Sequence, residues 1–182
     1  MSRLNTPSLD DTPAAARDTL GKVGAQLGFV PNMFRTIASN PTVLDAVVTL
    51  QGSLSRVLDA KTRHTIALAV SEANGCGYCL AIHTYVSSEF GGMSSQDIEL
   101  ARAGSSVDPK RAAVARFAQQ VVENRGRVSD ADLAAVRGAG YTDPEILAIT
   151  TVAVQALLTN FLNNINQTDI DVPSPAPVGT PS

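Results

Sequence analysis

Helix start signals constrain most strongly what this chain of 182 residues can fold into. In the interior of the chain a polar residue stands directly before a proline at Thr12-Pro13, Asn40-Pro41, Asp108-Pro109 and Asp143-Pro144. Proline favours the first helical position, because the N–H it lacks would find no partner there. Apolar residues follow each pair at steps of three and four, which is the helical period. No segment alternates apolar and polar residues in the manner of a half-buried strand, so the sequence predicts an all-α fold.

Further caps and glycines divide the chain into about eight or nine helices joined by short loops. We expect one helix to run from Pro41 to Leu58, because apolar residues continue at helical spacing that far. The sequence predicts one helical domain over residues 13–171. Residues 1–12 are predicted to form a loose N-terminal arm, and residues 172–182 a Pro-rich disordered tail.

Composition excludes several classes of function. The net charge is −3 and no basic patch is visible, so we expect no nucleic-acid partner. Apolar runs are interrupted before the roughly 18 residues that read as a membrane span. The first residues show no apolar stretch after their charge, so no secretory signal is expected. These features predict a cytoplasmic protein with no membrane association.

Residues 72–83 hold both cysteines of the chain and one of its two histidines. The Asn-Gly pair at 74–75 predicts a break between two helices, with Cys76 in the first turn of the second one. Free amides and the helix dipole favour a thiolate there. His83 lies one turn beyond Cys79, where it can accept the thiol proton and return it to a leaving group. On a continuous helix, Glu72 falls in the same stripe, roughly 60° wide, as these three residues.

Other interpretations of the cysteine pair stay open. Two small thiols in a core beside a hydrogen-bonded histidine would look similar. A zinc site needs four ligands, and Cys76, Cys79 and His83 supply three. A thioredoxin-type enzyme would place its C-x-x-C in a βαβ setting that this chain lacks. We therefore expect neither a metal nor another cofactor, and favour a helical protein with dithiol chemistry.

The segment 74–84, Asn-Gly-Cys-Gly-Tyr-Cys-Leu-Ala-Ile-His-Thr, resembles the signature of the alkylhydroperoxidase AhpD-like group in the carboxymuconolactone decarboxylase superfamily. The resemblance covers roughly residues 25–172. It implies an AhpD-like helical domain that assembles as a homo-oligomer, a trimer or hexamer. It also implies an antioxidant oxidoreductase that reduces organic hydroperoxides and is reduced in turn by a thiol protein or a small dithiol.

Individual roles follow from the same resemblance. Cys79 matches the peroxidatic cysteine, Cys76 the resolving cysteine of a redox-active disulfide, and His83 the relay histidine. The sequence departs from AhpD at Tyr78, where AhpD has histidine, and at His64, where it has glutamate. We therefore expect Glu72 to act as the catalytic acid in the proton relay, with His64 and Tyr78 as candidate relay residues.

The function expected is thus a thiol-dependent peroxidase, with two alternatives. A decarboxylase or lactone-handling enzyme would share the fold but has no evident task for the cysteine pair. A redox-responsive, non-catalytic oligomer would use its disulfide to switch assembly. Independently of the resemblance, residues 61–73 and 145–162 are apolar around most of a helix, which also predicts association with further copies.

Overall fold

The computed structural model describes residues 2–172, and this part of the chain contains nine α-helices and no strand. The predicted all-α class and the number of helices are therefore confirmed. The helices are α1 (Ala14–Leu27), α2 (Asn32–Ile37), α3 (Pro41–Leu54), α4 (Ala60–Ala73), α5 (Gly77–Glu89), α6 (Ser95–Arg102), α7 (Pro109–Glu123), α8 (Asp130–Gly138) and α9 (Asp143–Asn166).

Side-chain caps define most helix starts. An oxygen of the N-cap residue accepts a hydrogen bond from a backbone N–H of the first turn, which would otherwise lack a partner. In α6 and α8 the bond is reciprocal, forming a capping box. The capping residues of α3, α4, α6, α7 and α8 are Asn40, Asp59, Ser94, Asp108 and Ser129.

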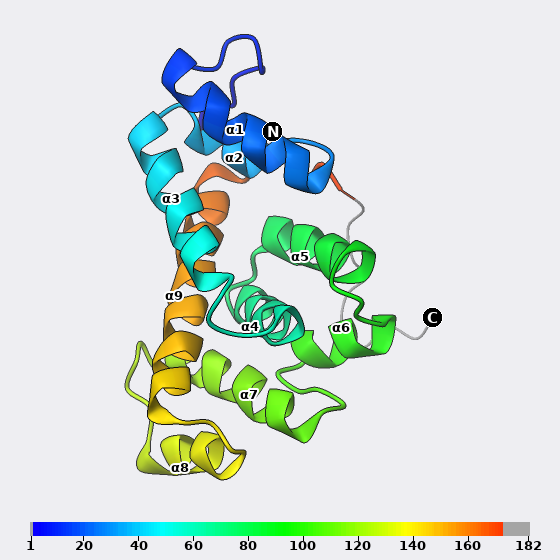
Figure 1. Cartoon of the computed structure of the whole chain (residues 1–182), viewed down its shortest axis with the longest axis vertical. Helices are drawn as coiled ribbons and strands as arrows, with labels where there is room; N and C mark the ends of the chain where they lie inside the picture. The colour runs from blue at the N-terminus through cyan, green and yellow to red at the C-terminus, as the bar shows by residue number, and fades with distance from the viewer. Residues whose placement is uncertain (1, 173–182) are drawn as a thin grey trace.

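The longest helix, α9, runs along one side of the molecule, and α4 packs against it near the centre (Figure 1). Helix α4 also contacts α5, α6 and α7, so it lies at the centre of the packing. This explains why its residues 65–71 are all buried. The C-terminal end of α4 delivers the chain to the cysteine segment.

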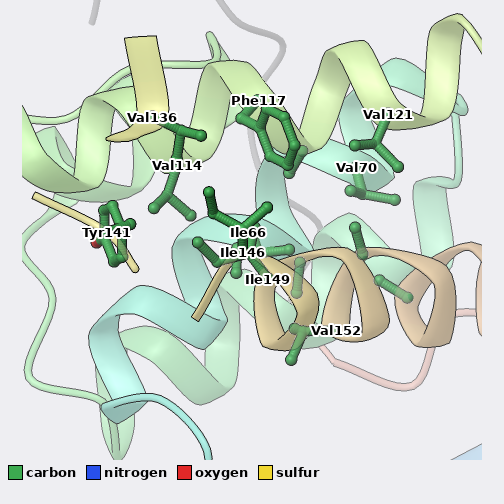
Figure 2. Close-up of a cluster of buried hydrophobic side chains, with 14 of the residues drawn as sticks. Ile66, Val70, Val114, Phe117, Val121, Val136, Tyr141, Ile146, Ile149 and Val152 are labelled. Carbon is green, nitrogen blue, oxygen red and sulfur yellow. The ribbon is translucent and has the colours of Figure 1, made fainter. Parts of the chain in front are cut away.

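The larger core cluster joins α4, α7, α8 and α9 (Figure 2). Ile66 of α4 and Ile149 of α9 are fully buried there, beside Val114 of α7. Burying one such side chain contributes about 1.5–3 kcal/mol of transfer free energy. This cluster holds α4 and α9 together in the part of the domain away from the cysteines.

A second core cluster packs α1, α2 and α3 against the start of α5. Leu20, Phe34 and Leu44 belong to it, and so do both cysteines. The cysteine segment is therefore enclosed by the three N-terminal helices.

Helix α9 is long and apolar enough to cross a membrane by length and composition. A core helix passes the same test, and α9 packs against α3, α4, α5 and α7 while burying three asparagines. Its outer face nevertheless carries a stripe of exposed apolar side chains. This α9 stripe consists of Leu147, Val154, Leu158, Phe161 and Ile165.

Two predictions differ from the structure, one about the end of a helix and one about the N-terminal arm. Helix α3 ends at Leu54, not Leu58, because Asp59 must be extended to cap α4. The N-terminal arm is not loose where it is described, because Leu4 N–H donates to Asn166 Oδ1 at 2.6 Å and Arg35 donates to Pro7 O. Almost all of the predicted disordered tail, residues 173–182, lies outside the described residues.

Candidate active site

A tight turn between α4 and α5 positions the first cysteine. Gly75 has φ +58°, the left-handed conformation that glycine adopts readily. Its N–H donates to Glu72 O, and Cys76 N–H donates to Ser71 O, both at 3.0 Å. This is the Schellman pattern that ends many helices. The predicted break is thus present, and it places Cys76 at the N-cap of α5.

The two cysteines share the first turn of α5. Cys79 N–H donates to Cys76 Sγ at 3.3 Å, so a sulfur serves as the N-cap acceptor. Both residues are free thiols and both are buried. Cys79 lines a pocket, and Cys76 does not belong to the lining of that pocket.

The environment shifts the pKa values of the two thiols in opposite directions. The pKa of Cys79 is lowered, chiefly because the Cys76 thiol donates a hydrogen bond to its sulfur, with further donation from the amides of Asn160 and Asn163. The same bond, together with burial, raises the pKa of Cys76. The pair therefore holds one proton on Cys76 and favours the thiolate at Cys79.

The pocket in front of Cys79 has a volume of about 360 Å³ and carries no ionisable lining group other than the cysteine and two histidines. Helices α1, α2, α3, α4, α5 and α9 all contribute to it. Its lining is Val23, Gln26, Leu27, Met33, Phe34, Val48, Gln51, Gly52, Ser55, His64, Cys79, Ile82, His83, Val86 and Thr159.

His83 and His64 both line this pocket and contact each other edge to face, with ring centroids 6.4 Å apart. Burial lowers the pKa of His83 to about 3, with His64 adding a smaller effect. Burial also lowers the pKa of His64, helped by the charge of Arg63. Both imidazoles are therefore neutral at pH 7. Within residues 2–172, His83 makes no hydrogen bond to Cys79, although both line the same pocket.

Glu72 does not reach the pocket. Its carboxylate accepts a hydrogen bond from Arg102 Nε at 2.7 Å, an ion pair between α4 and α6. The turn at Gly75 breaks the helical phase, so the stripe drawn on a continuous helix does not continue into α5. The structure thus separates Glu72 from the cysteines, where the sequence placed them on one face.

Tyr78 is not among the residues that line the pocket. Its hydroxyl accepts a hydrogen bond from Met33 N–H at 3.2 Å, in the first turn of α2. Burial raises the pKa of Tyr78, so the phenol stays protonated at neutral pH. Its contact ties α5 to α2. No three His, Cys, Asp or Glu side chains in the described part of the chain gather as a metal site would require.

Asn163 is the residue at the site that sequence reasoning missed, because the asparagines near the end of α9 resemble a fraying helix end. Its side-chain nitrogen donates to Cys79 Sγ at 3.3 Å. A signal was present, because Ile149, Ala156, Asn160 and Asn163 continue the buried face of α9 at helical spacing. Polar residues on a buried face indicate a hydrogen-bonded network.

The fold and the site define an all-helical protein with a dithiol at the N-terminus of a helix. Residues 41–123, from α3 to α7, match the carboxymuconolactone decarboxylase family model. The structure is similar to an alkylhydroperoxidase AhpD core, an uncharacterized peroxidase-related protein from Ralstonia eutropha JMP134. The identity is 25%, the TM-score 0.82, and the match covers 93% of this chain and 92% of that one. Over residues 41–123 the chain is thus similar to the carboxymuconolactone decarboxylase family, and its fold is that of an alkylhydroperoxidase AhpD core.

Two further solved structures share the fold. An uncharacterized peroxidase-related protein from Silicibacter sp. TM1040 matches with 24% identity, a TM-score of 0.80, and coverage of 92% of this chain and 91% of that one. The debrominase Bmp8, in complex with 2,3,4-tribromopyrrole, matches with 16% identity, a TM-score of 0.81, and coverage of 94% and 92%. A comparison with curated proteins found no match.

Proposed function

We propose that the protein is a thiol peroxidase that reduces organic hydroperoxides through Cys79 and Cys76. One observation carries the proposal. The thiol favoured as thiolate is the one that lines an apolar pocket, and a second, protonated thiol is hydrogen-bonded to it. The match of residues 41–123 to the family model and the peroxidase-related protein of similar structure support the same chemistry.

The reaction has three balanced steps. The Cys79 thiolate attacks the distal oxygen of ROOH, the O–O bond breaks, and ROH leaves with one proton while Cys79 becomes a sulfenic acid. The Cys76 thiol then attacks the Cys79 sulfur, forming the disulfide and releasing water. An external dithiol, from a protein or a small molecule, supplies two electrons and two protons to restore both thiols.

His83 is suited to move the proton that this chemistry requires. A neutral imidazole has one donor and one acceptor nitrogen, so it can take a proton on one side while giving one from the other. Because burial keeps His83 neutral, it acts as a shuttle and not as a stored positive charge. His64, in edge contact with it, offers a second neutral imidazole in the same role.

The pocket lining favours an uncharged, apolar peroxide. Val23, Phe34 and Ile82 present apolar surface, and the lining carries no Asp, Glu, Lys or Arg to pair with a charged substrate. Burying a carboxylate without a partner is costly. We therefore expect cumene or tert-butyl hydroperoxide to be preferred over a peroxide that bears a carboxylate.

Association of several copies is part of the proposal. The α9 stripe leaves five large apolar side chains exposed along one helix face. An apolar stripe of this kind favours burial against a further copy of the chain.

The test is peroxide consumption with a dithiol reductant, measured for wild type, Cys79→Ser and Cys76→Ser. Cys79→Ser should abolish turnover. Cys76→Ser should allow a single oxidation of Cys79 and then stop. If both variants consume peroxide at the wild-type rate, the proposal is wrong.

Two controls separate the alternatives. A γ-carboxylactone activity that survives replacement of both cysteines would indicate a decarboxylase-type enzyme. A change of oligomer size between reduced and oxidised protein, without turnover, would indicate a redox-responsive assembly.

A further inference from the structure

We propose that Asn163 is a catalytic residue, whose side-chain amide donates a hydrogen bond to Cys79 Sγ and stabilises the thiolate that attacks the peroxide. The inference rests on the proposed function for its chemistry and on the geometry of α9 for its position. The amide nitrogen lies 3.3 Å from the sulfur, so it contacts the reacting atom itself.

A second hydrogen bond orients the amide. The same nitrogen, Nδ2, donates to the backbone oxygen of Thr159 at 2.9 Å. Turning the amide over would place its oxygen against that carbonyl, where two acceptors would face each other. The N–H is therefore directed at the sulfur by the helix backbone, without help from the substrate.

Burial strengthens this contact. Asn163 is 3% exposed and Cys79 is 1% exposed, so little water competes for the sulfur. A hydrogen bond to a charged group is stronger than one between neutral groups, and more so where water is excluded. A neutral donor also stabilises the thiolate without adding a cation to the apolar pocket.

Asn160 supports the arrangement one turn earlier on α9. Its amide donates to Ser71 Oγ at 3.1 Å and its oxygen accepts from Asn74 at 3.0 Å. Both partners lie at the C-terminal end of α4, beside the turn that carries Cys76. These bonds hold α9 against the cysteine segment, and they fix the Asn160 amide that also contributes to lowering the pKa of Cys79.

Few titratable groups face Cys79 from the elements packed around it. Cys76 precedes it in the turn, Tyr78 and His83 lie on α5, and His64 lies on α4. Asn160 and Asn163 are the groups from α9, and neither titrates. A change at Asn163 therefore alters the titration of Cys79 through the hydrogen bond and not through the loss of a charge.

The test measures the thiolate directly, in the full chain with Cys76→Ser so that only Cys79 reacts. The rate of alkylation by iodoacetamide is followed from about pH 5 to pH 10, where the thiolate fraction sets the rate. Asn163→Ala should move the midpoint up by about one pH unit, and should slow alkylation about tenfold at pH values well below the parent midpoint. Asn163→Asp, which keeps the shape, should move it further, because a carboxylate repels the thiolate.

Asn166→Ala is the matched control. Asn166 is equally buried on the same helix but donates to Thr36 and Thr168 and to neither cysteine. The midpoint of alkylation against pH in the Asn166→Ala variant should stay at the parent value, and circular dichroism checks that the variant keeps its helicity. If Asn163→Asp folds and keeps the parent midpoint, the inference is wrong.

Peroxide consumption is measured separately in variants that retain Cys76. A shifted midpoint in a protein whose wild type consumes no peroxide would overturn the proposed function and leave the role of Asn163 at the sulfur intact. Peroxide turnover with an unshifted midpoint would overturn only the inference about Asn163.

Discussion

Glu72→Gln separates a structural role of Glu72 from a catalytic one. The change keeps the size of the side chain and removes its charge from the pair with Arg102, whose Nε lies 2.7 Å from Glu72 Oε2. The Arg102 side chain is 8% exposed and the Glu72 side chain 33%. The guanidinium therefore stays buried when the carboxylate beside it is lost.

The expected cost lies between two limits. Exposed ion pairs contribute about 0–1 kcal/mol, whereas breaking a buried pair costs about 3–5 kcal/mol. With one partner buried and the other partly solvated, we expect a loss of about 1–2 kcal/mol in the free energy of unfolding. For a chain of this length that corresponds to a fall in Tm of roughly 4 °C.

The assay combines thermal unfolding with peroxide turnover. Because Glu72 lies outside the pocket, kcat/KM should stay within about twofold of wild type, a difference too small to reflect a lost proton-transfer group. Arg137→Gln is the control, since it breaks a pair with Asp143 of similar length whose side chains are 54% and 71% exposed. That variant should lose no more than about 0.5 kcal/mol. An unchanged Tm together with a tenfold or larger fall in kcat/KM would refute this reasoning and restore Glu72 as the relay acid.

Two other predictions concern protonation and assembly. Because burial lowers the pKa of His83 to about 3, the unfolded chain, with a histidine pKa near 6.5, binds the proton first as pH falls. Stability is thus complete above about pH 6.5 and declines toward the folded pKa, by roughly 1 kcal/mol between pH 7 and pH 5.5 for this one group. Urea unfolding of His83→Gln should show a correspondingly flatter pH dependence, and an equally steep one would contradict the assignment. In light scattering, wild type should exceed the 19.0 kDa of one chain, and Leu147→Glu with Phe161→Glu should lower the mass toward it. A monomeric wild type at micromolar concentration would refute the association.

The helices could be predicted because their signals are local. Asn40, Asp108 and Ser129 each cap a helix within three residues of their own position, so no knowledge of the fold is needed. The end of α3 was misplaced because apolar residues continue at helical spacing past Leu54. There the cap that Asp59 provides for α4 decides the boundary.

The site was predicted only in part, for a physical reason. The relation of Cys76 to Cys79 is set within one turn of helix, so their spacing is enough to place them together. The contacts of Cys79 with Asn163 and of His83 with His64 depend on how α9 and α4 pack against α5. A helical projection cannot give that packing. It also fails across Gly75, which is why Glu72 was assigned to the wrong surface.

The N-cap position of Cys76 links sulfur chemistry to the folding of a helix end. Its sulfur accepts a hydrogen bond from the N–H of Cys79. A disulfide between the two residues would therefore use the same sulfur atom that caps the first turn of α5. Serine is a strong N-cap and alanine a poor one. Cys76→Ser therefore removes the redox chemistry while keeping the anchor, and Cys76→Ala removes both. The difference in the free energy of unfolding between these two variants would measure how much a side-chain N-cap at position 76 stabilises the first turn of α5.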